Sequence, residues 1–147
     1  MTRNREMMKP FLDRGYAVIA SNSLGREGHK GGFWSFIPGR PNLRNKLTFT
    51  HQVLDDTVAK FGIDRDQLLL TGFSIGGSFT WYLACQTPTD LAAYSKIAES
   101  FWRPHPTVCS GPIKMLRTHS WVDPTVPLDG RPIWGGLIHQ DNIFQEL

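Results

Sequence analysis

The spacing of apolar residues along the chain predicts three helices. One spans residues 3–14, a second spans 47–61, and a third follows an apolar strand and ends near Pro88. Gly62 comes directly after the second helix, where a glycine in the left-handed conformation is a common stop signal. Four apolar residues of that helix fall on one face: Leu47, Leu54, Val58 and Phe61.

Short apolar runs between these helices predict strands. They cover residues 16–21, 67–71, 91–98 and 113–118, and a glycine-rich loop from Gly25 to Gly32 follows the first of them. Strands that alternate with helices are typical of an α/β fold, so we expect a mainly parallel sheet with helices on both faces. The 147 residues suffice for one domain with a moderate core, and they contain no internal repeat or linker.

The segment Gly72-Phe73-Ser74-Ile75-Gly76 joins the strand at 67–71 to the third helix. A Gly-x-Ser-x-Gly turn between a strand and a helix is the pattern of a nucleophile elbow, in which a strained backbone lifts the serine hydroxyl above the sheet. Gly72 and Gly76 lack a Cβ and should let strand and helix approach closely. Ser74 is therefore the candidate nucleophile, and the N–H of Ile75, at the positive end of the helix dipole, is the candidate oxyanion donor. The alternative is a structural glycine turn that carries an ordinary serine.

Asp123 follows the strand at 113–118, in a loop that also holds His119. A serine hydrolase needs a carboxylate to orient its histidine base and to stabilise the imidazolium, and the chain order serine then aspartate fits an α/β-hydrolase. Asp123 is therefore the candidate acid, against the alternative of a turn aspartate. We expect His119 to shape the turn. His139 is the one histidine beyond Asp123, and it lies at the start of an expected helix over 137–147, before the strand that should present the base.

Composition and charge argue against nucleic-acid binding, membrane insertion and metal binding. A net charge of +3 comes from scattered basic residues and from two small clusters, which we expect on solvated surface: Arg3, Arg5 and Lys9, and Arg40, Arg44 and Lys46. The basic face with interleaved aromatics that nucleic-acid binding requires is missing. No apolar run is long enough for a membrane span or a signal-peptide core, so we expect a soluble chain without an export signal. The five histidines are spread singly, so we expect no metal or other cofactor.

Together, several segments resemble the polyhydroxybutyrate depolymerase and feruloyl esterase group of α/β-hydrolases. The matching segments are Gly72 to Gly77, Leu83 to Cys85, Cys109 before a strand, His119 to Asp123, and Val126-Pro127; residues 61–68 also resemble the entry to the elbow strand. The resemblance implies a serine esterase that cleaves carboxylic esters, such as polyesters, short acyl esters, or feruloyl and acetyl esters on plant polysaccharide. Its substrate would then be an ester, polymeric in some members.

The two cysteines, Cys85 near the end of the third helix and Cys109 in a later loop, allow one disulfide. The alternative is one buried thiol and one loop thiol. Members of the group that the chain resembles are often exported, which suits a bridge between Cys85 and Cys109.

The family that the chain resembles also has strands and a loop for which we find no counterpart in residues 1–147. The strand at 16–21 resembles the family's fourth strand, so the third strand and its His-Gly loop, which donates the second oxyanion amide, have no counterpart. The strand that presents the base histidine should come after residues 137–147. We therefore expect residues 1–147 to form a single, incomplete α/β-hydrolase domain. Loss of one oxyanion donor typically costs about a hundredfold to a thousandfold in rate.

A serine ester hydrolase is thus the leading hypothesis, with two alternatives. One is a non-catalytic hydrolase remnant that binds a ligand through a cleft around Phe33, Trp34 and Trp102. The other is a peptidase or thioesterase, because this fold does not choose among acyl substrates. Trp121 lies beside the acid loop and is a candidate cleft residue, whereas Trp81 on the third helix is expected in packing. Substrate identity, oligomeric state and compartment remain open at this point.

Overall fold

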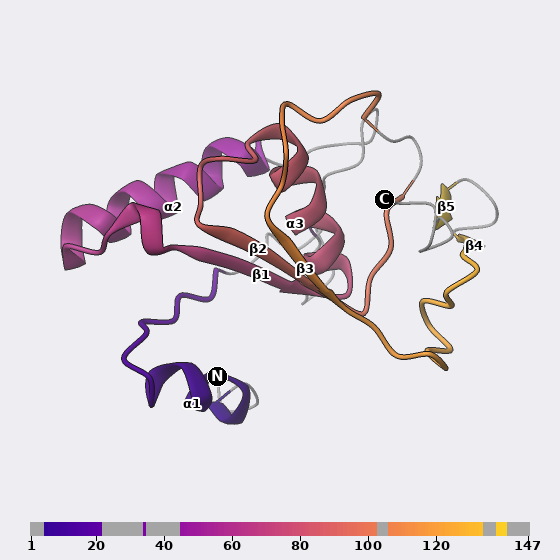
Figure 1. The fold of residues 1–147 in the computed structure, drawn as a ribbon, viewed down its shortest axis with the longest axis horizontal. Helices are drawn as coiled ribbons and strands as arrows, with labels where there is room; N and C mark the ends of the chain where they lie inside the picture. The colour runs from indigo at the N-terminus through magenta and orange to yellow at the C-terminus, as the bar shows by residue number, and fades with distance from the viewer. Residues whose placement is uncertain (1–4, 22–33, 35–44, 103–105, 134–137, 141–147) are drawn as a thin grey trace, which may run out of the picture. The chain divides into compact units, whose positions relative to one another are not determined.

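The computed structural model describes residues 5–21, 34, 45–102, 106–133 and 138–140 and divides into two units, residues 1–33 and residues 34–147 (Figure 1). The glycine-rich loop expected at 25–32 lies outside the described residues. None of the described helices is long and apolar enough to cross a membrane.

The described part of the first unit is a short helix followed by an extended segment. Helix α1 spans Arg5–Leu12, and its exposed side chains include an ion pair between Lys9 and Asp13 at 2.6 Å. Residues 16–21 form no strand, so the predicted first strand is wrong. A strand exists only where a neighbouring backbone completes its ladder of hydrogen bonds, and an apolar run alone does not supply that neighbour.

Helix α2 (Lys46–Phe61) begins the regular structure of the second unit and agrees with the predicted helix over 47–61. At its start, the side chain of Asn45 accepts a hydrogen bond from the Thr48 N–H at 3.0 Å. At its end, Gly62 adopts the left-handed conformation with φ 63° and donates its N–H to the Val58 carbonyl. Lys46, expected on solvated surface, is buried, with its Nζ 5.6 Å from the Trp34 ring centre.

Three parallel strands form the central sheet of this unit, in the order β1-β2-β3. They are β1 (Leu69–Phe73), β2 (Ala93–Ile97) and β3 (Met115–Thr118), each within or next to a predicted strand. Helix α3 (Ile75–Gln86) connects β1 to β2, and the short 3-10 helix η1 (Arg65–Gln67) precedes β1. A parallel sheet with flanking helices, as predicted for an α/β fold, is therefore present.

The two faces of this sheet differ. On one face, Ala84 of α3 packs against Leu91 and Tyr94 in a buried cluster, and Leu54 of α2 joins the same cluster. Helices α2 and α3 accordingly lie on the same side of the sheet (Figure 1). The opposite face exposes apolar side chains that point away from α3, namely Leu69, Phe73 and Leu116. Helices on both faces were expected, but the described residues of this unit place them on one.

Two short strands, β4 (Arg131–Ile133) and β5 (Ile138–Gln140), pair in antiparallel fashion with Pro132 opposite His139. The helix predicted to begin at residue 137 is therefore wrong over residues 138–140, and residues 141–147 lie outside the described part. Three residues are too few for a periodicity to separate a helix from a strand, and pairing with Arg131–Ile133 decides the outcome.

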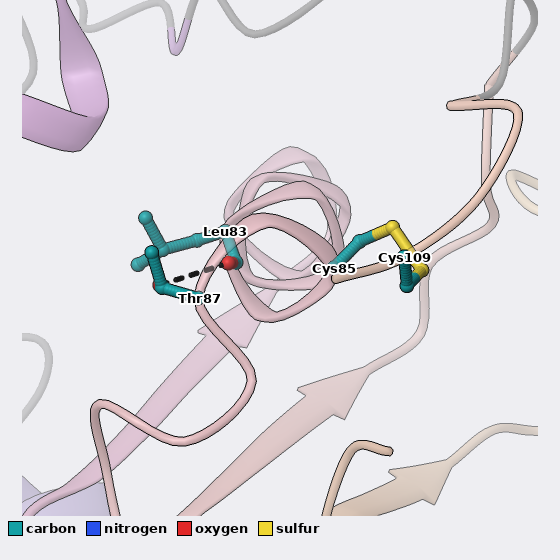
Figure 2. The surroundings of a disulfide bond; sticks show 4 residues. All are labelled: Leu83, Cys85, Thr87 and Cys109. Carbon is teal, nitrogen blue, oxygen red and sulfur yellow. Dashed lines mark hydrogen bonds between the residues drawn. A yellow bond between two sulfur atoms is a disulfide. The ribbon is translucent and has the colours of Figure 1, made fainter. Parts of the chain in front are cut away.

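A disulfide joins Cys85, in the last turn of α3, to Cys109 in the loop before β3 (Figure 2). The Ser110 N–H donates to the Cys85 carbonyl at 2.9 Å, so a backbone hydrogen bond accompanies the bridge. Thr87 closes the same helix end, because both its N–H and its hydroxyl donate to the Leu83 carbonyl (Figure 2). Of the two cysteine arrangements that the sequence left open, the structure contains the bridge.

Removing this bridge should lower the stability of the second unit. The two cysteines are 24 residues apart, and closing a loop of that length stabilises a fold by about 3 kcal/mol. We expect the double variant Cys85→Ala/Cys109→Ala to lose about that much free energy of unfolding in urea titrations. As a control, reductant should destabilise the wild type to the same extent and leave the variant unchanged. An identical unfolding midpoint in wild type and variant would contradict this expectation.

Candidate active site

Ser74 lies in a strained turn between β1 and α3. Its backbone has φ 53° and ψ −128°, a conformation that residues other than glycine rarely adopt. Hydrogen bonds hold this turn on both sides: the Ser74 N–H donates to the Ile97 carbonyl at 2.9 Å, and the Ser74 carbonyl accepts from the N–H groups of Gly77 and Ser78 at 2.8 and 3.1 Å. Strain of this kind persists only where the surroundings enforce it, and it gathers at functional sites. The strained backbone expected of a nucleophile elbow is present at Ser74.

Two glycines allow strand and helix to meet at this turn. A Cβ on Gly72 would overlap the carbonyl oxygen of Gly76, so the close approach expected at Gly72 is confirmed. Gly76 forms the other side of this contact through its carbonyl oxygen, although a Cβ on Gly76 itself would have nothing within 4 Å. A further close approach is at Gly77, where a Cβ would lie 2.5 Å from Cγ of Glu99 and 3.0 Å from the Gly72 carbonyl oxygen. The glycine at position 77 was visible in the sequence, but only the fold shows which residues lie beside it.

Ile75 is the first residue of α3 and lies directly after Ser74. The first N–H groups of any helix have no acceptor within the helix. Gly77 and Ser78 donate to the Ser74 carbonyl, and among the described residues no backbone carbonyl accepts from the Ile75 N–H. The amide of Ile75 is therefore in a position from which it can donate to an anion formed beside Ser74, and its oxyanion role stays a prediction.

Asp123 belongs to a compact loop after β3. One of its carboxylate oxygens, Oδ1, accepts hydrogen bonds from the N–H groups of Thr125 and Val126, at 2.8 and 2.9 Å. The other, Oδ2, lies 3.8 Å from Nε2 of His119. The hydrogen bond from the Val126 N–H, then that from Thr125, lowers the pKa of Asp123 below its ordinary value of 3.8, with His119 and Arg131 adding to the effect. Asp123 therefore stabilises the turn, as the alternative interpretation proposed, and presents an ionised oxygen on its other side.

His119 is the first residue of the same loop, and its side chain helps to hold the loop together. Its Nε2 lies 2.8 Å from the Val126 carbonyl, which can only accept, so this nitrogen carries a hydrogen. Its Nδ1 is buried and has no hydrogen-bond partner among the described residues. The Val126 carbonyl contact agrees with the expected role of His119 in shaping the turn.

The parallel sheet brings Ser74 and the Asp123 loop to the same edge. Ser74 follows β1 and His119 follows β3, while β2 lies between them. The hydrogen bonds Ser74 N–H to Ile97 and Ala98 N–H to Thr118 link the three strand ends in a row. Neighbouring strands are roughly 4.8 Å apart, so the backbones after β1 and β3 are about 10 Å apart. Asp123 comes five residues after the end of β3, so the strand spacing places the start of its loop relative to Ser74 and not the carboxylate itself.

The two described histidine side chains, His51 and His119, have contacts with residues other than Ser74. His51, on α2, pairs with Asp90 at 3.4 Å; Asp90 precedes β2, at the sheet edge opposite to Ser74. His119 is held in the acid loop. His139 lies in β5, but its side chain is outside the described part, as are His29 and His105. The part of the chain that is described also contains no group of three or more His, Cys, Asp or Glu able to hold a metal ion.

The tryptophans divide into packed and exposed ones. Trp81 stacks on Phe101 with ring centres 4.5 Å apart, as expected of a packing residue. Trp102 is buried, so it offers no open face to a ligand, and Phe33, its expected neighbour in a cleft, lies outside the described residues. Trp34 stacks on Phe79 at 5.0 Å. By contrast, Trp121 is 81% exposed, two residues from Asp123.

Acid should weaken the fold through Asp123. Because the pKa of this carboxyl is lower in the folded chain than in the unfolded one, its ionised form adds stability above the ordinary value of 3.8, and that stability disappears as the pH falls through the lower folded pKa. We expect the free energy of unfolding, measured in urea from about pH 5 to pH 2, to fall less steeply in Asp123→Asn than in the wild type. Asp129→Asn, a substitution of the same charge in the neighbouring turn, is the control. Equal slopes in wild type and Asp123→Asn would overturn the expectation.

A scan against protein-family models and searches among curated proteins and solved structures found no significant match, so the resemblance to the depolymerase and feruloyl esterase group rests on the residues of this chain alone.

Proposed function

We propose that this chain carries the nucleophile and the acid of a serine hydrolase that acts on carboxylic esters. The observation that carries the proposal is the backbone of Ser74, which is strained, directly after a parallel strand, and directly before the first turn of a helix. A serine in an ordinary glycine turn needs no such conformation. A nucleophile does, because the turn lifts its hydroxyl out of the sheet and next to the helix amides.

In this reaction the Ser74 hydroxyl attacks the ester carbonyl and loses its proton to a histidine base. The N–H of Ile75 would stabilise the oxyanion of the tetrahedral intermediate. The intermediate collapses to an acyl-serine as the base returns its proton to the departing alcohol, and water then hydrolyses the acyl-serine. Asp123 would orient the base and stabilise its imidazolium form through Oδ2, the oxygen that is not used for the turn.

The substrate class is proposed from the resemblance to polyhydroxybutyrate depolymerases and feruloyl esterases. It comprises polyesters, short acyl esters, and feruloyl or acetyl esters of plant polysaccharide. Exposure of Trp121 beside Asp123 supports a substrate with a flat or apolar group, because an aromatic face in water can stack on such a group. A second candidate function is a non-catalytic remnant of such an enzyme. It is favoured by one observation: the described histidine side chains have other partners, His51 with Asp90 and His119 with the Val126 carbonyl.

An activity-based probe tests the nucleophile. A fluorophosphonate reacts with serine hydroxyls that a base and an oxyanion site have activated, so we expect covalent labelling of the purified chain at Ser74, located by mass spectrometry. Ser74→Ala should abolish the label, whereas Ser110→Ala, in the exposed loop after Cys109, should leave it unchanged. A folded wild-type chain that takes no label would favour the non-catalytic alternative.

A comparison of a large and a small ester tests whether Trp121 contacts the substrate. We expect Trp121→Ala to raise KM for a feruloyl ester about twofold to tenfold, the worth of one aromatic stacking contact, and to leave KM for a short acetyl ester unchanged. Val108→Ala, which removes an exposed apolar side chain elsewhere, is the matched control. Equal effects on both esters would remove Trp121 from the substrate site without affecting the assignment of Ser74.

A further inference from the structure

Three charged side chains lie together behind the first turn of α3, two of them buried and one partly buried. The side chain of Glu99 is fully buried, and those of Lys96 and Arg117 are 5% and 19% exposed. Lys96 Nζ lies 3.1 Å from Glu99 Oε1, and Arg117 Nη2 lies 3.9 Å from the same oxygen. Arg117 Nη2 also donates to the backbone carbonyl of Glu99 at 2.7 Å. On its other side, Lys96 Nζ lies 4.6 Å from the ring centre of Trp81.

Stability alone does not account for this cluster. Removing charged groups from water is costly, and apolar side chains of similar volume often stabilise a fold as well or better. Buried ion pairs are best attested where they fix one arrangement of the chain against others. The question is therefore which segment the cluster holds in place.

The segment in question is residues 97–100, immediately after β2, and it touches the candidate nucleophile. The Ile97 carbonyl accepts from the Ser74 N–H at 2.9 Å, and the Ser100 carbonyl accepts from the Ser78 hydroxyl at 2.9 Å. Between them, the Glu99 side chain fills the space that a Cβ on Gly77 would need. The elbow and the first turn of α3 thus rest on this segment at three successive points.

The same segment is itself strained. Ala98 has φ 48°, in the left-handed region that residues other than glycine rarely adopt. Such a conformation needs surroundings that enforce it. Arg117 supplies a bond to the Glu99 carbonyl one residue later, and the Ala98 N–H is held by the Thr118 carbonyl at 2.9 Å. The contacts of Arg117 with Glu99 therefore lie directly beside the strained Ala98.

We propose that Glu99 is a positioning residue of the elbow. Its buried carboxylate, held by Lys96 and Arg117, fixes residues 97–100 and through them the strained backbone of Ser74. Glu99 acts on the nucleophile through the backbone and does not touch the reacting atoms. The consequence for catalysis rests on the proposed function, whereas the consequence for the backbone of Ser74 does not.

Hydrogen exchange tests the effect on the backbone. The Ser74 amide reports the bond to Ile97, and the Tyr94 amide, bonded to the Lys114 carbonyl in the same sheet, reports the stability of the unit as a whole. In Glu99→Gln, which keeps the shape and removes the charge, we expect the ratio of the Ser74 to the Tyr94 exchange rate to rise at least tenfold. Leu91→Ala, a cavity in the core away from the elbow, should destabilise the unit and leave this ratio unchanged. An unchanged ratio in Glu99→Gln overturns the proposal.

A second variant keeps the test decisive if Glu99→Gln does not fold. Lys96→Met/Glu99→Gln removes one positive and one negative charge together, so the net charge of the cluster is unchanged and the remaining charge, on Arg117, belongs to a side chain that is 19% exposed. This double variant should fold, and its exchange ratio should still rise at least tenfold, because the ion pairs of the Glu99 carboxylate are gone and only the Arg117 bond to the Glu99 carbonyl remains. A ratio equal to that of the wild type in this folded variant also overturns the proposal.

The labelling rate separates this proposal from the proposed function. In folded Glu99→Gln we expect the second-order rate of fluorophosphonate labelling to fall at least tenfold, with Leu91→Ala within twofold of the wild type. Absence of labelling in the wild type, together with the raised exchange ratio, would sink the hydrolase proposal and support the positioning role. Normal labelling of the wild type, together with an unchanged exchange ratio in Glu99→Gln, would support the hydrolase proposal and overturn the positioning role.

Discussion

The second unit depends on one close contact, between the backbone of Gly72 in β1 and the carbonyl of Gly76 in α3. No side chain fits between them, so α3 must leave the strand at a fixed angle and run back across one face of the sheet. That course brings Ala84 against Tyr94 and buries the centre of the unit. It also forces the reversal of the chain at Ser74, whose backbone takes up the strain. Packing and candidate chemistry therefore come from the same contact.

Ser74 and Asp123 are placed by different means. Ser74 is held by backbone bonds to β2 and to α3, so its position is a property of the sheet and helix together. Asp123 is held inside its own loop, by two backbone N–H groups and by the neighbouring His119. The sheet order places β2 between the strands that lead to them.

The interior of this unit contains both apolar and charged side chains. Apolar side chains fill one end of the interface between α3 and the sheet, around Ala84, Leu91 and Tyr94. At the other end, nearest Ser74, the interior holds the charges of Lys96 and Glu99. An apolar core tolerates small shifts of packing, whereas a buried ion pair loses much of its compensation when its partners move apart.

Local signals in the sequence determined the elements whose conformation depends on residues close by in the chain. These are helix α2, which Gly62 ends, the strands of the parallel sheet, and the strained turn at Ser74. The same signals could not determine what depends on residues far along the chain. Residues 16–21 are apolar and yet form no strand, and residues 138–140 form one because Arg131–Ile133 lie opposite. Gly77 makes a further close approach because Glu99 packs beside it. Lys96, Glu99 and Arg117 come from two strands and a turn, and their spacing in sequence carries no sign of a cluster. Periodicity and turn chemistry report the conformation of a segment, whereas pairing and burial are set by whichever segments the fold brings beside it.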